Sequence, residues 1–205
     1  MRQLLGTKIG MTAVFTETGD RVSVTVVQAG PCPILKVKTK ETDGYHAAVL
    51  GYGSGHKRNF NKPGLGFFKK INAEPTRFLR EVRLGSAEEL RAGDVWTVDI
   101  FKPGEKVRVT GISKGKGFQG AVRRHHFRGG PKSHGQSDRQ RSPGSVGASS
   151  YPARTFRGQR MAGHMGDQKV TQRNVKVVNI DIENNLILLK GAVPGARNGL
   201  VIIRN

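Results

Sequence analysis

Residues 21–28 read RVSVTVVQ, and this stretch decides the fold class. Valine occupies every second position from 22 to 26, with Ser23 and Thr25 between, which is the two-residue period of a half-buried β-strand. Gly, Pro, Asp and Asn separate further short segments of the same kind. The strands predicted before the middle of the chain are 21–28, 34–40, 46–52, 78–84, 95–101 and 106–110.

The C-terminal part has the same character. Residues 175–182 and 186–190 predict a hairpin around Glu183-Asn184-Asn185, and residues 200–204 predict a last strand. One short helix is expected, because Ser86 and Glu89 form a capping box and Gly93 follows as a stop signal. Many short strands with few helices predict a mainly β fold built on a small closed or nearly closed β-barrel.

The net charge points to a polyanionic partner. The chain has 35 Lys and Arg against 15 Asp and Glu, a formal charge of +20. Such an excess repels itself in the compact state unless a polyanion neutralises it, and the candidates are nucleic acid and an anionic membrane surface. A spanning segment needs a run of about 18 apolar residues, which the sequence lacks, and its first residues do not predict a secretory signal. We therefore expect nucleic acid and no membrane.

The charge is concentrated in the middle of the chain. Residues 111–173 hold 13 Lys and Arg, only two acidic residues and 12 of the 28 glycines, and they contain no Leu. A stretch of this composition cannot bury enough apolar surface to offset its chain entropy. We predict a globular domain of residues 1–110 and 171–205, with a small insertion at about 55–77. Residues 111–170 then form a long, mostly irregular, Gly- and Arg-rich loop between its strands.

Two local features have expected structural roles. Phe67 and Phe68, within the small insertion, are expected to pack into a small core, with a partner contact as the alternative. Cys32, the single cysteine, lies between two prolines with no acid or base beside it, so we expect a buried or semi-buried thiol, not a nucleophile, in a reducing, intracellular compartment.

Residues 115–120 read GKGFQG and match the G-x-G-x-x-G pattern of dinucleotide-binding loops. The flanks predict no βαβ unit, and residues 121–126 (AVRRHH) do not predict an amphipathic helix. We interpret the glycines instead as backbone that approaches phosphates closely, with neighbouring Lys and Arg supplying charge. No cofactor is predicted.

Two further constellations are set aside. Four of the six histidines lie in the basic segment, but no Cys joins them and their spacing matches no zinc pattern, so stacking on bases or donation to phosphates is preferred to metal binding. Ser133, His134 and Asp138 lack the nucleophile elbow of a hydrolase, so no catalytic residue is predicted.

Five apolar side chains are scattered singly among the Arg and Gly residues. The sequence leaves open whether they form a local core or insert between bases. They are Phe127, Tyr151, Phe156, Met161 and Met165.

Several motifs, in order along the whole chain, resemble the large-subunit ribosomal protein L-three family, bacterial type. They are LGTKIGMT (5–12), AGPCP (29–33), VTGISKGKGFQG (109–120), SHG (133–135), PGSVG (143–147), RMAGHMG (160–166) and LKGAVPG (189–195). Two positions depart from the family pattern. Arg108 stands where the family usually has an acidic or amide residue, and Ala148-Ser149-Ser150 stands where some relatives carry Gln and Asn. Ser150 stands in place of a Gln that is methylated in some relatives, so that modification is not expected.

The resemblance implies a barrel similar to that of translation factors, and a long extension whose tip, residues 144–152, approaches the peptidyl transferase centre. It implies a structural, non-enzymatic constituent of the large ribosomal subunit, in the cytoplasm, which binds the 23S-type rRNA near its 3′ end and nucleates subunit assembly. It also implies neighbouring proteins, namely L-fourteen and L-nineteen, and no small-molecule substrate.

The expected rRNA contacts are the basic residues of the middle segment, its histidines, and two serines at the implied tip. They are Lys114, Lys116, Arg123, Arg124, His125, His126, Arg128, Lys132, His134, Arg139, Arg141, Ser149, Ser150, Arg154, Arg157, Arg160, His164 and Lys169. Two other functions stay open from the sequence alone. One is a non-ribosomal nucleic-acid module, and the other is a nucleotide-dependent enzyme that uses residues 115–120.

Overall fold

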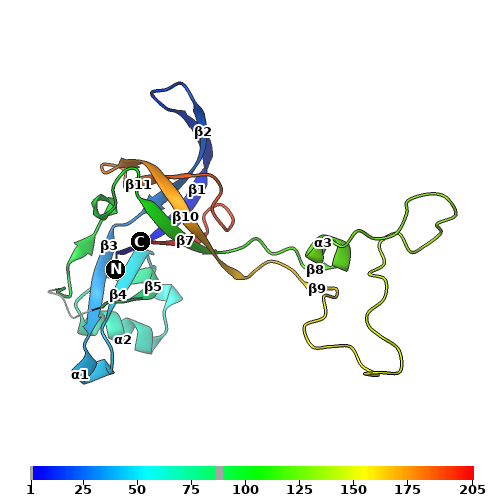
Figure 1. Ribbon diagram of the computed structural model, residues 1–205. Coiled ribbons are helices and arrows are strands. Elements are labelled where there is room, and N and C mark those ends of the chain that lie inside the picture. The colour runs from blue at the N-terminus through cyan, green and yellow to red at the C-terminus, as the bar shows by residue number, and fades with distance from the viewer. Residues whose placement is uncertain (1, 86–89) are drawn as a thin grey trace. The chain divides into compact units, whose positions relative to one another are not determined.

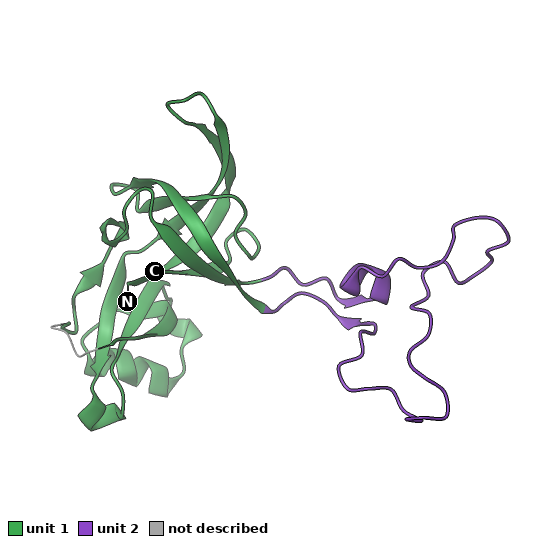
Figure 2. Cartoon of the chain, in the orientation of Figure 1, with its two compact units in different colours: residues 1–112, 169–205 green, residues 113–168 purple. Residues whose placement is uncertain are grey.

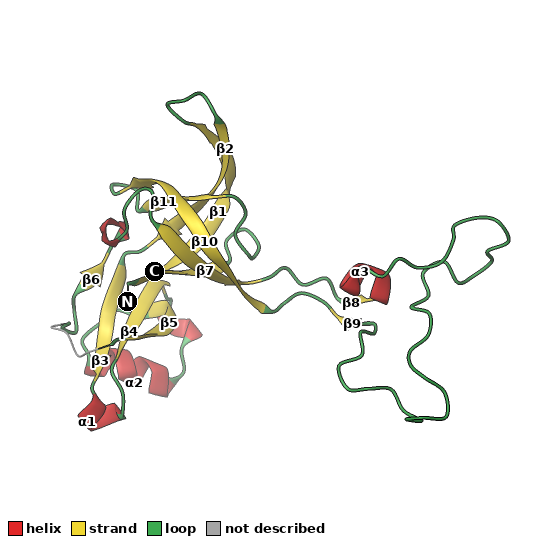
Figure 3. Ribbon diagram, viewed as in Figure 1, coloured by secondary structure: helices red, strands yellow, loops and turns green. Residues whose placement is uncertain are grey.

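The computed structural model describes residues 2–85 and 90–205, and the chain divides into two units (Figure 2). Unit 1 comprises Met1–Ile112 and Lys169–Asn205, and unit 2 comprises Ser113–Gln168. Strands dominate unit 1, whereas unit 2 is mostly loop (Figure 3). The predicted mainly β fold is confirmed.

Unit 1 contains a closed antiparallel barrel (Figure 1). Its strands, in order around the barrel, are β1 (Gln3–Phe15), β12 (Leu200–Arg204), β7 (Lys106–Ile112), β10 (Lys169–Asp181), β11 (Leu186–Lys190) and β2 (Arg21–Ala29). Unit 2 is inserted between β7 and β10, which pair with each other from Lys169 opposite Ile112 onward. The pairing of β7 with β10 therefore completes the barrel at the place where the chain leaves it for unit 2 and returns.

Alternating apolar residues explain most barrel strands. In β11, Ile187 and Leu189 are buried, and in β12, Val201 and Ile203 are buried. Strand β1 was not predicted, because Leu4, Leu5 and Gly6 are all buried in succession and leave no two-residue period to read. Burial on both faces replaces alternation with a continuous apolar run.

A second sheet packs against the barrel. Its order is β5 (Thr76–Arg83), β4 (Ala47–Ser54), β3 (Cys32–Lys38) and β6 (Val95–Trp96). Ile34 and Leu50 of this sheet share one hydrophobic core with Leu5 and Val27 of the barrel. The Tyr52 hydroxyl donates a hydrogen bond to the Gln28 carbonyl at 2.9 Å, which also joins the two sheets.

The predicted strand at 95–101 is wrong beyond Trp96. A 3-10 helix, η2 (Val98–Ile100), follows, and Val98 and Phe101 are both buried. These two side chains are three positions apart, which is the repeat of a 3-10 helix and not of a strand. Ser86 and Glu89, which predicted a helix ending at Gly93, lie outside the described residues.

The small insertion contains α2 (Lys62–Lys70), preceded by the 3-10 helix η1 (Lys57–Asn59). The Asn61 side chain caps α2 by accepting from the Gly64 amide at 2.9 Å. Phe68 is 2% exposed and meets the Phe60 ring edge to face, with 5.5 Å between centroids. The expected small core around Phe68 is therefore present.

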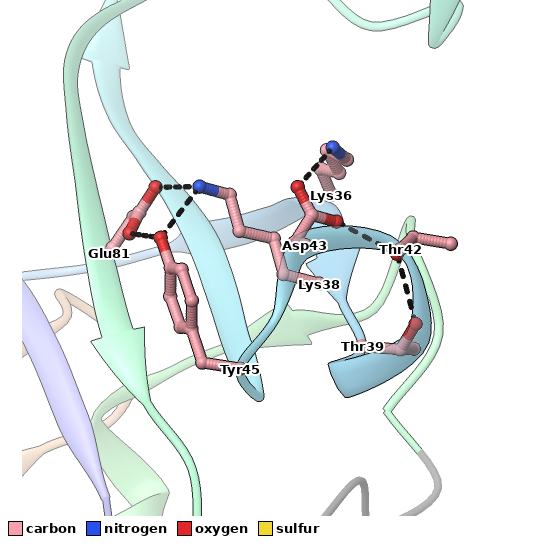
Figure 4. Close-up of polar contacts among 7 residues, drawn as sticks. All are labelled: Lys36, Lys38, Thr39, Thr42, Asp43, Tyr45 and Glu81. Carbon is pink, nitrogen blue, oxygen red and sulfur yellow. Dashed lines mark hydrogen bonds and ion pairs between the residues drawn. The ribbon is translucent and has the colours of Figure 1, made fainter.

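A polar network joins two strands of the second sheet, β3 and β5, to the residues that follow β3 (Figure 4). Lys38 at the end of β3 forms an ion pair with Glu81 of β5, and the Tyr45 hydroxyl donates to Glu81 at 2.9 Å. These partners raise the pKa of Lys38 and lower the pKa of Glu81. Lys36 also pairs with Asp43 of the short helix α1 (Lys40–Asp43) at 3.1 Å, and a hydrogen bond from Thr42 and this ion pair lower the pKa of Asp43.

The Lys8 side chain binds backbone carbonyls in the barrel wall. Its ammonium donates to the Val193 carbonyl at 2.7 Å and to the Gly195 carbonyl at 3.4 Å. Two motifs far apart in the sequence, LGTKIGMT and LKGAVPG, therefore meet through this side chain. These carbonyl oxygens help to satisfy a buried ammonium, since Lys8 is only 9% exposed.

Candidate nucleic-acid interface

Two extended strands of unit 2 run side by side and fix its first and last residues. The Ser113 amide donates to the Gln168 carbonyl at 2.9 Å, and the Lys116 amide donates to the Met165 carbonyl at 2.9 Å. Strands β8 (Phe118–Gln119) and β9 (Gly163–His164) continue the pairing. Lys114 and Lys116 are thereby held on an ordered backbone.

Glycine is required where these strands come closest. Gly166 has φ +77°, and a Cβ there would lie 2.1 Å from the Lys114 carbonyl oxygen. A backbone oxygen cannot move away as a flexible side chain can, so the residue must lack a Cβ. At Gly163 a Cβ would lie 2.5 Å from Arg124 Nη1, because the Arg124 guanidinium covers this glycine.

A short helix, α3 (Ala121–His125), places two predicted contact residues, Arg124 and His125, beside the backbone of Met161. Arg124 Nη1 donates to the Met161 carbonyl at 2.9 Å, and His125 Nε2 lies 3.0 Å from the same oxygen. The sequence predicted no amphipathic helix after the glycine motif, and the helix that the structure has there is limited to these five residues. The helix ends at His126, whose left-handed backbone (φ +61°) stops it.

These elements surround a hollow of about 480 Å³ in unit 2. It gathers five of the predicted contact residues: Lys114, Lys116, Arg124, His125 and His164. Ser113 and Gln168 also line it and were not predicted, because polar neutral residues carry no charge signal in the sequence. The lining contains no carboxylate, so the hollow offers cations and hydrogen-bond donors suited to an anion such as a phosphate.

The remaining predicted residues of unit 2 do not converge on this hollow. They lie exposed along residues 123–160, apart from one another in the chain. They are Arg123, His126, Arg128, Lys132, His134, Arg139, Arg141, Ser149, Ser150, Arg154, Arg157 and Arg160. A turn closes part of this loop, because the Gly130 amide donates to the Gln140 carbonyl at 2.9 Å.

The single apolar residues of unit 2 form no common local core. Tyr151 is 88% exposed, Phe156 is 61% exposed and Met161 is 38% exposed. The Arg154 guanidinium lies over the Phe156 ring at 5.7 Å from its centroid. Phe127 and Met165 are half-buried, and Phe127 lies beside His125 with 6.1 Å between ring centroids. The exposed aromatic faces are free to stack on another surface.

Unit 2 is strongly basic, and its positive charge greatly exceeds its negative charge. It has eleven Lys and Arg against Asp138 and Asp167, and ten of the eleven are exposed while Arg124 is half-buried. Within residues 2–85 and 90–205 the ion pairs are Lys36–Asp43 and Lys38–Glu81, both in unit 1. The positive charge of unit 2 is therefore directed to solvent or to a partner.

Lys169, the last predicted contact, belongs to unit 1 and lies in β10. It lines a hollow of about 630 Å³ together with Arg80 and Arg204, which the sequence did not single out. These three cations come from strands far apart in the chain, so no local motif could have grouped them. In the described part of the chain, Arg204 Nε is buried without a hydrogen-bond partner.

The described residues hold neither a cluster of metal ligands nor a helix suited to a bilayer. Across residues 2–85 and 90–205, no three His, Cys, Asp or Glu side chains gather as metal ligands would. Among the same residues, none of the helices has the length and apolar character needed to cross a membrane.

Comparison with known proteins adds an independent finding. The family model described as Ribosomal protein L3 matches residues 82–185. The large ribosomal subunit protein uL3 of Herpetosiphon aurantiacus is 51% identical over 200 residues, which cover 98% of this chain and 94% of that protein. The uL3 protein of Acidothermus cellulolyticus is 52% identical over 204 residues, covering 100% and 92%. That of Pelotomaculum thermopropionicum is 51% identical over 201 residues, covering 98% and 95%.

Proposed function

The chain belongs to the large ribosomal subunit protein uL3 family, and from this premise we propose that unit 2 is its main rRNA-binding segment. The family resemblance found in the sequence motifs is confirmed. The protein is a structural constituent of the large ribosomal subunit in the cytoplasm, where it partners rRNA and other ribosomal proteins, and it is not an enzyme. The interpretation of residues 115–120 as part of a nucleotide-dependent enzyme is therefore set aside.

The observation that carries the proposal is the uncompensated charge of unit 2. Eleven Lys and Arg stand against two acidic residues, on a backbone with little buried apolar surface. When such cations meet phosphates, condensed counterions are released from the nucleic acid, and this release favours binding. The same phosphates relieve the mutual repulsion of the cations. Binding and ordering of the segment are thereby coupled.

The residues divide into three proposed roles. The hollow formed by Lys114, Lys116, Arg124, His125 and His164 binds backbone phosphate, because donors converge there and no carboxylate does. The exposed arginines of residues 123–160 contact phosphates along the RNA path. Tyr151 and Phe156 stack on unpaired bases, since both rings are exposed and Phe156 also lies beside Arg154. Contacts of this kind read RNA shape more than base sequence.

The finer assignments follow from the family resemblance. We infer that the protein binds near the 3′ end of the 23S-type rRNA, helps to nucleate subunit assembly, and places residues 144–152 near the peptidyl transferase centre. Ser149 and Ser150 lie within this tip, and neither can accept the glutamine methylation of some relatives. The proposed protein neighbours are L-fourteen and L-nineteen, and residues 1–110 with 171–205 form the globular anchor.

Limited proteolysis tests the proposal directly. Trypsin is expected to cut the free protein first at the exposed Arg and Lys of residues 123–160. Adding the 3′ domain of 23S-type rRNA should protect these sites, whereas cuts at Lys57 and Arg58 in unit 1 serve as the internal reference. Equal cutting of unit 2 with and without RNA would contradict the proposal.

Sucrose-gradient sedimentation separates this role from that of a non-ribosomal nucleic-acid module. The protein is expected to stay with large subunits after a high-salt wash, because its contacts are inside an assembled particle. Release to the top of the gradient would favour the alternative.

A further inference from the structure

The β1–β2 hairpin has a strand edge that the barrel does not use. Strand β12 pairs with β1 only from Gln3 to Thr7. The Lys8 amide then donates to the Gly199 carbonyl and the Asn198 amide donates to the Lys8 carbonyl, and these two bonds end that contact. Arg197 Nε then donates to the Ile9 carbonyl at 3.1 Å. Within the described residues, β1 beyond this point pairs with β2 alone, and Figure 1 shows this hairpin running past the rest of the barrel.

The register identifies which backbone groups face outward. The Thr16 amide donates to the Asp20 carbonyl at 3.0 Å, and the pairs Val14–Val22 and Thr12–Val24 continue in the same phase. In an antiparallel ladder hydrogen-bonded pairs alternate with pairs that bond outward. The amide and carbonyl groups of residues 11, 13 and 15 therefore point to the open edge.

This edge lacks the usual protection against strand addition. Residues 10–15 read GMTAVF, with no charge and no proline to block pairing. Met11 is 53% exposed and Phe15 is 71% exposed. Both line a shallow hollow of about 600 Å³ with Ala13, Ser23 and Arg21. An open edge beside an apolar surface fits an added strand with apolar side chains at alternate positions.

The charge of the β1–β2 hairpin favours a protein partner over RNA. Residues 10–20 contain no Lys or Arg, although the whole chain has a formal charge of +20. The turn carries Glu17 and Asp20, both exposed, with Arg21 as the adjoining cation. Two carboxylates repel phosphate and attract Lys or Arg of a polypeptide.

We propose that residues 10–15 of β1 are a strand-addition site for an extended segment of another protein of the large subunit. That segment pairs with the outward backbone groups of residues 11, 13 and 15, and its Lys or Arg meets Glu17 and Asp20. This mode of recognition draws affinity from main-chain hydrogen bonds and specificity from alternate side chains. The inference rests on the proposed function, because it places the partner inside the same particle.

Site-specific photocrosslinking in assembled subunits tests the proposal. Phe15 is replaced by p-benzoylphenylalanine, purified large subunits are irradiated, and the linked peptide is sequenced by mass spectrometry. The expected product is a Lys- or Arg-containing peptide of a different large-subunit protein. The same probe at Ile182, which is 62% exposed in another turn of unit 1, is the matched control and should not yield that peptide. A crosslink only to rRNA, only to a second copy of this chain, or to nothing would overturn the proposal.

Strand addition itself is tested with proline at Ala13. Pro removes an outward amide and is tolerated where that amide faces away from the hairpin. In subunits carrying the Phe15 probe, Ala13→Pro should lower the crosslink yield about fivefold or more, whereas Ala13→Val keeps the amide and the yield. Unchanged yield with Ala13→Pro would refute strand addition.

A second variant, Phe15→Ser, controls for a folding defect caused by the proline, because it leaves the backbone amides of the hairpin intact. In subunits that carry this variant, the partner protein identified by the crosslink should be retained less well after a salt wash. Full retention of that partner would contradict a role for the apolar surface. Incorporation of each variant into large subunits and its rRNA binding are measured in the same samples. Failure of the wild-type chain to incorporate would count against the proposed function, whereas full incorporation without the protein crosslink counts against this inference alone.

Discussion

At the scale of single residues, burial decides the chemistry of Cys32. The side chain has no exposed surface and its thiol lies 3.5 Å from the Leu5 carbonyl. Burial raises its pKa from 9.0 to about 11, with the contact to the Leu5 carbonyl as a smaller opposing effect. The prediction of a buried thiol is confirmed, and a neutral thiol of this kind is a poor nucleophile.

The raised pKa predicts a loss of stability at high pH. Between pH 9.0 and 11 the unfolded chain loses the Cys32 proton while the folded chain keeps it, so unfolding becomes easier as pH rises. The expected contribution is about 1.4 kcal/mol per pH unit in this window and nothing below it. Urea unfolding at pH 8, 9, 10 and 11 measures it, with Cys32→Ser as the variant that lacks the titrating thiol. The prediction would be contradicted if the free energy of unfolding changed with pH by the same amount in both proteins.

Gly166 supplies the second residue-scale prediction. In Gly166→Ala the left-handed backbone costs about 1–2 kcal/mol, and the new Cβ would also collide with the Lys114 carbonyl oxygen. The paired strands of unit 2 should separate, which faster hydrogen exchange at the Lys116 and Met165 amides would detect. Gly147→Ala is the control, since its Cβ would meet nothing within 4 Å. Unaltered exchange in Gly166→Ala would show that the close approach is not needed.

At the scale of elements, the strands in which alternate residues are buried were predicted most accurately. Strands 186–190 and 200–204 alternate and were predicted with the bounds that the structure has. Strand β1 was missed because its first residues are buried on both faces. Helix α2 was missed because Pro63, Gly64 and Gly66 lower its intrinsic helix propensity, and only packing of Phe68 and the Asn61 cap hold it.

The dependence of α2 on one buried ring is testable. Phe68→Ala should lower the free energy of unfolding by about 3 kcal/mol, because a fully buried aromatic side chain leaves a cavity. Phe67→Ala is the matched neighbour, and its more exposed ring should cost less than half as much. Thermal unfolding of the isolated protein provides the comparison. Equal destabilisation by the two variants would show that Phe68 does not anchor the helix.

At the scale of the whole molecule, composition located the basic segment but not its geometry. Charge and glycine content identified residues 111–173, and eleven of their cations lie in unit 2. That His164 lines the same hollow as Lys114 and Lys116 could not be read from the sequence. Neither strand there has an apolar alternation, and their pairing follows from backbone bonds and the close approach at Gly166. The individual rRNA contacts stay predictions.

The segregated charge predicts a salt dependence that is specific to unit 2. Changing Arg139, Arg141, Arg154 and Arg157 to Gln should reduce the slope of log binding constant against log salt by about 0.7–0.9 for each phosphate that is no longer neutralised. Filter binding to 23S-type rRNA between low and moderate salt gives the slope. The control changes Lys40, Lys57, Arg58 and Lys62 of unit 1, which are also exposed. The prediction fails if both sets alter the slope equally.

The place where unit 2 joins the barrel has a consequence for how such proteins diversify. Its ends leave from Ile112 and Lys169, which are opposite each other on neighbouring strands, so the ring of strands is complete whatever chain lies between them. A lineage can lengthen, shorten or rewrite that insert without altering the shear of the barrel, whereas a one-residue change inside a strand would shift it. Changes that fit the insert to different ribosome interiors therefore leave the strand pairing of the barrel as it is.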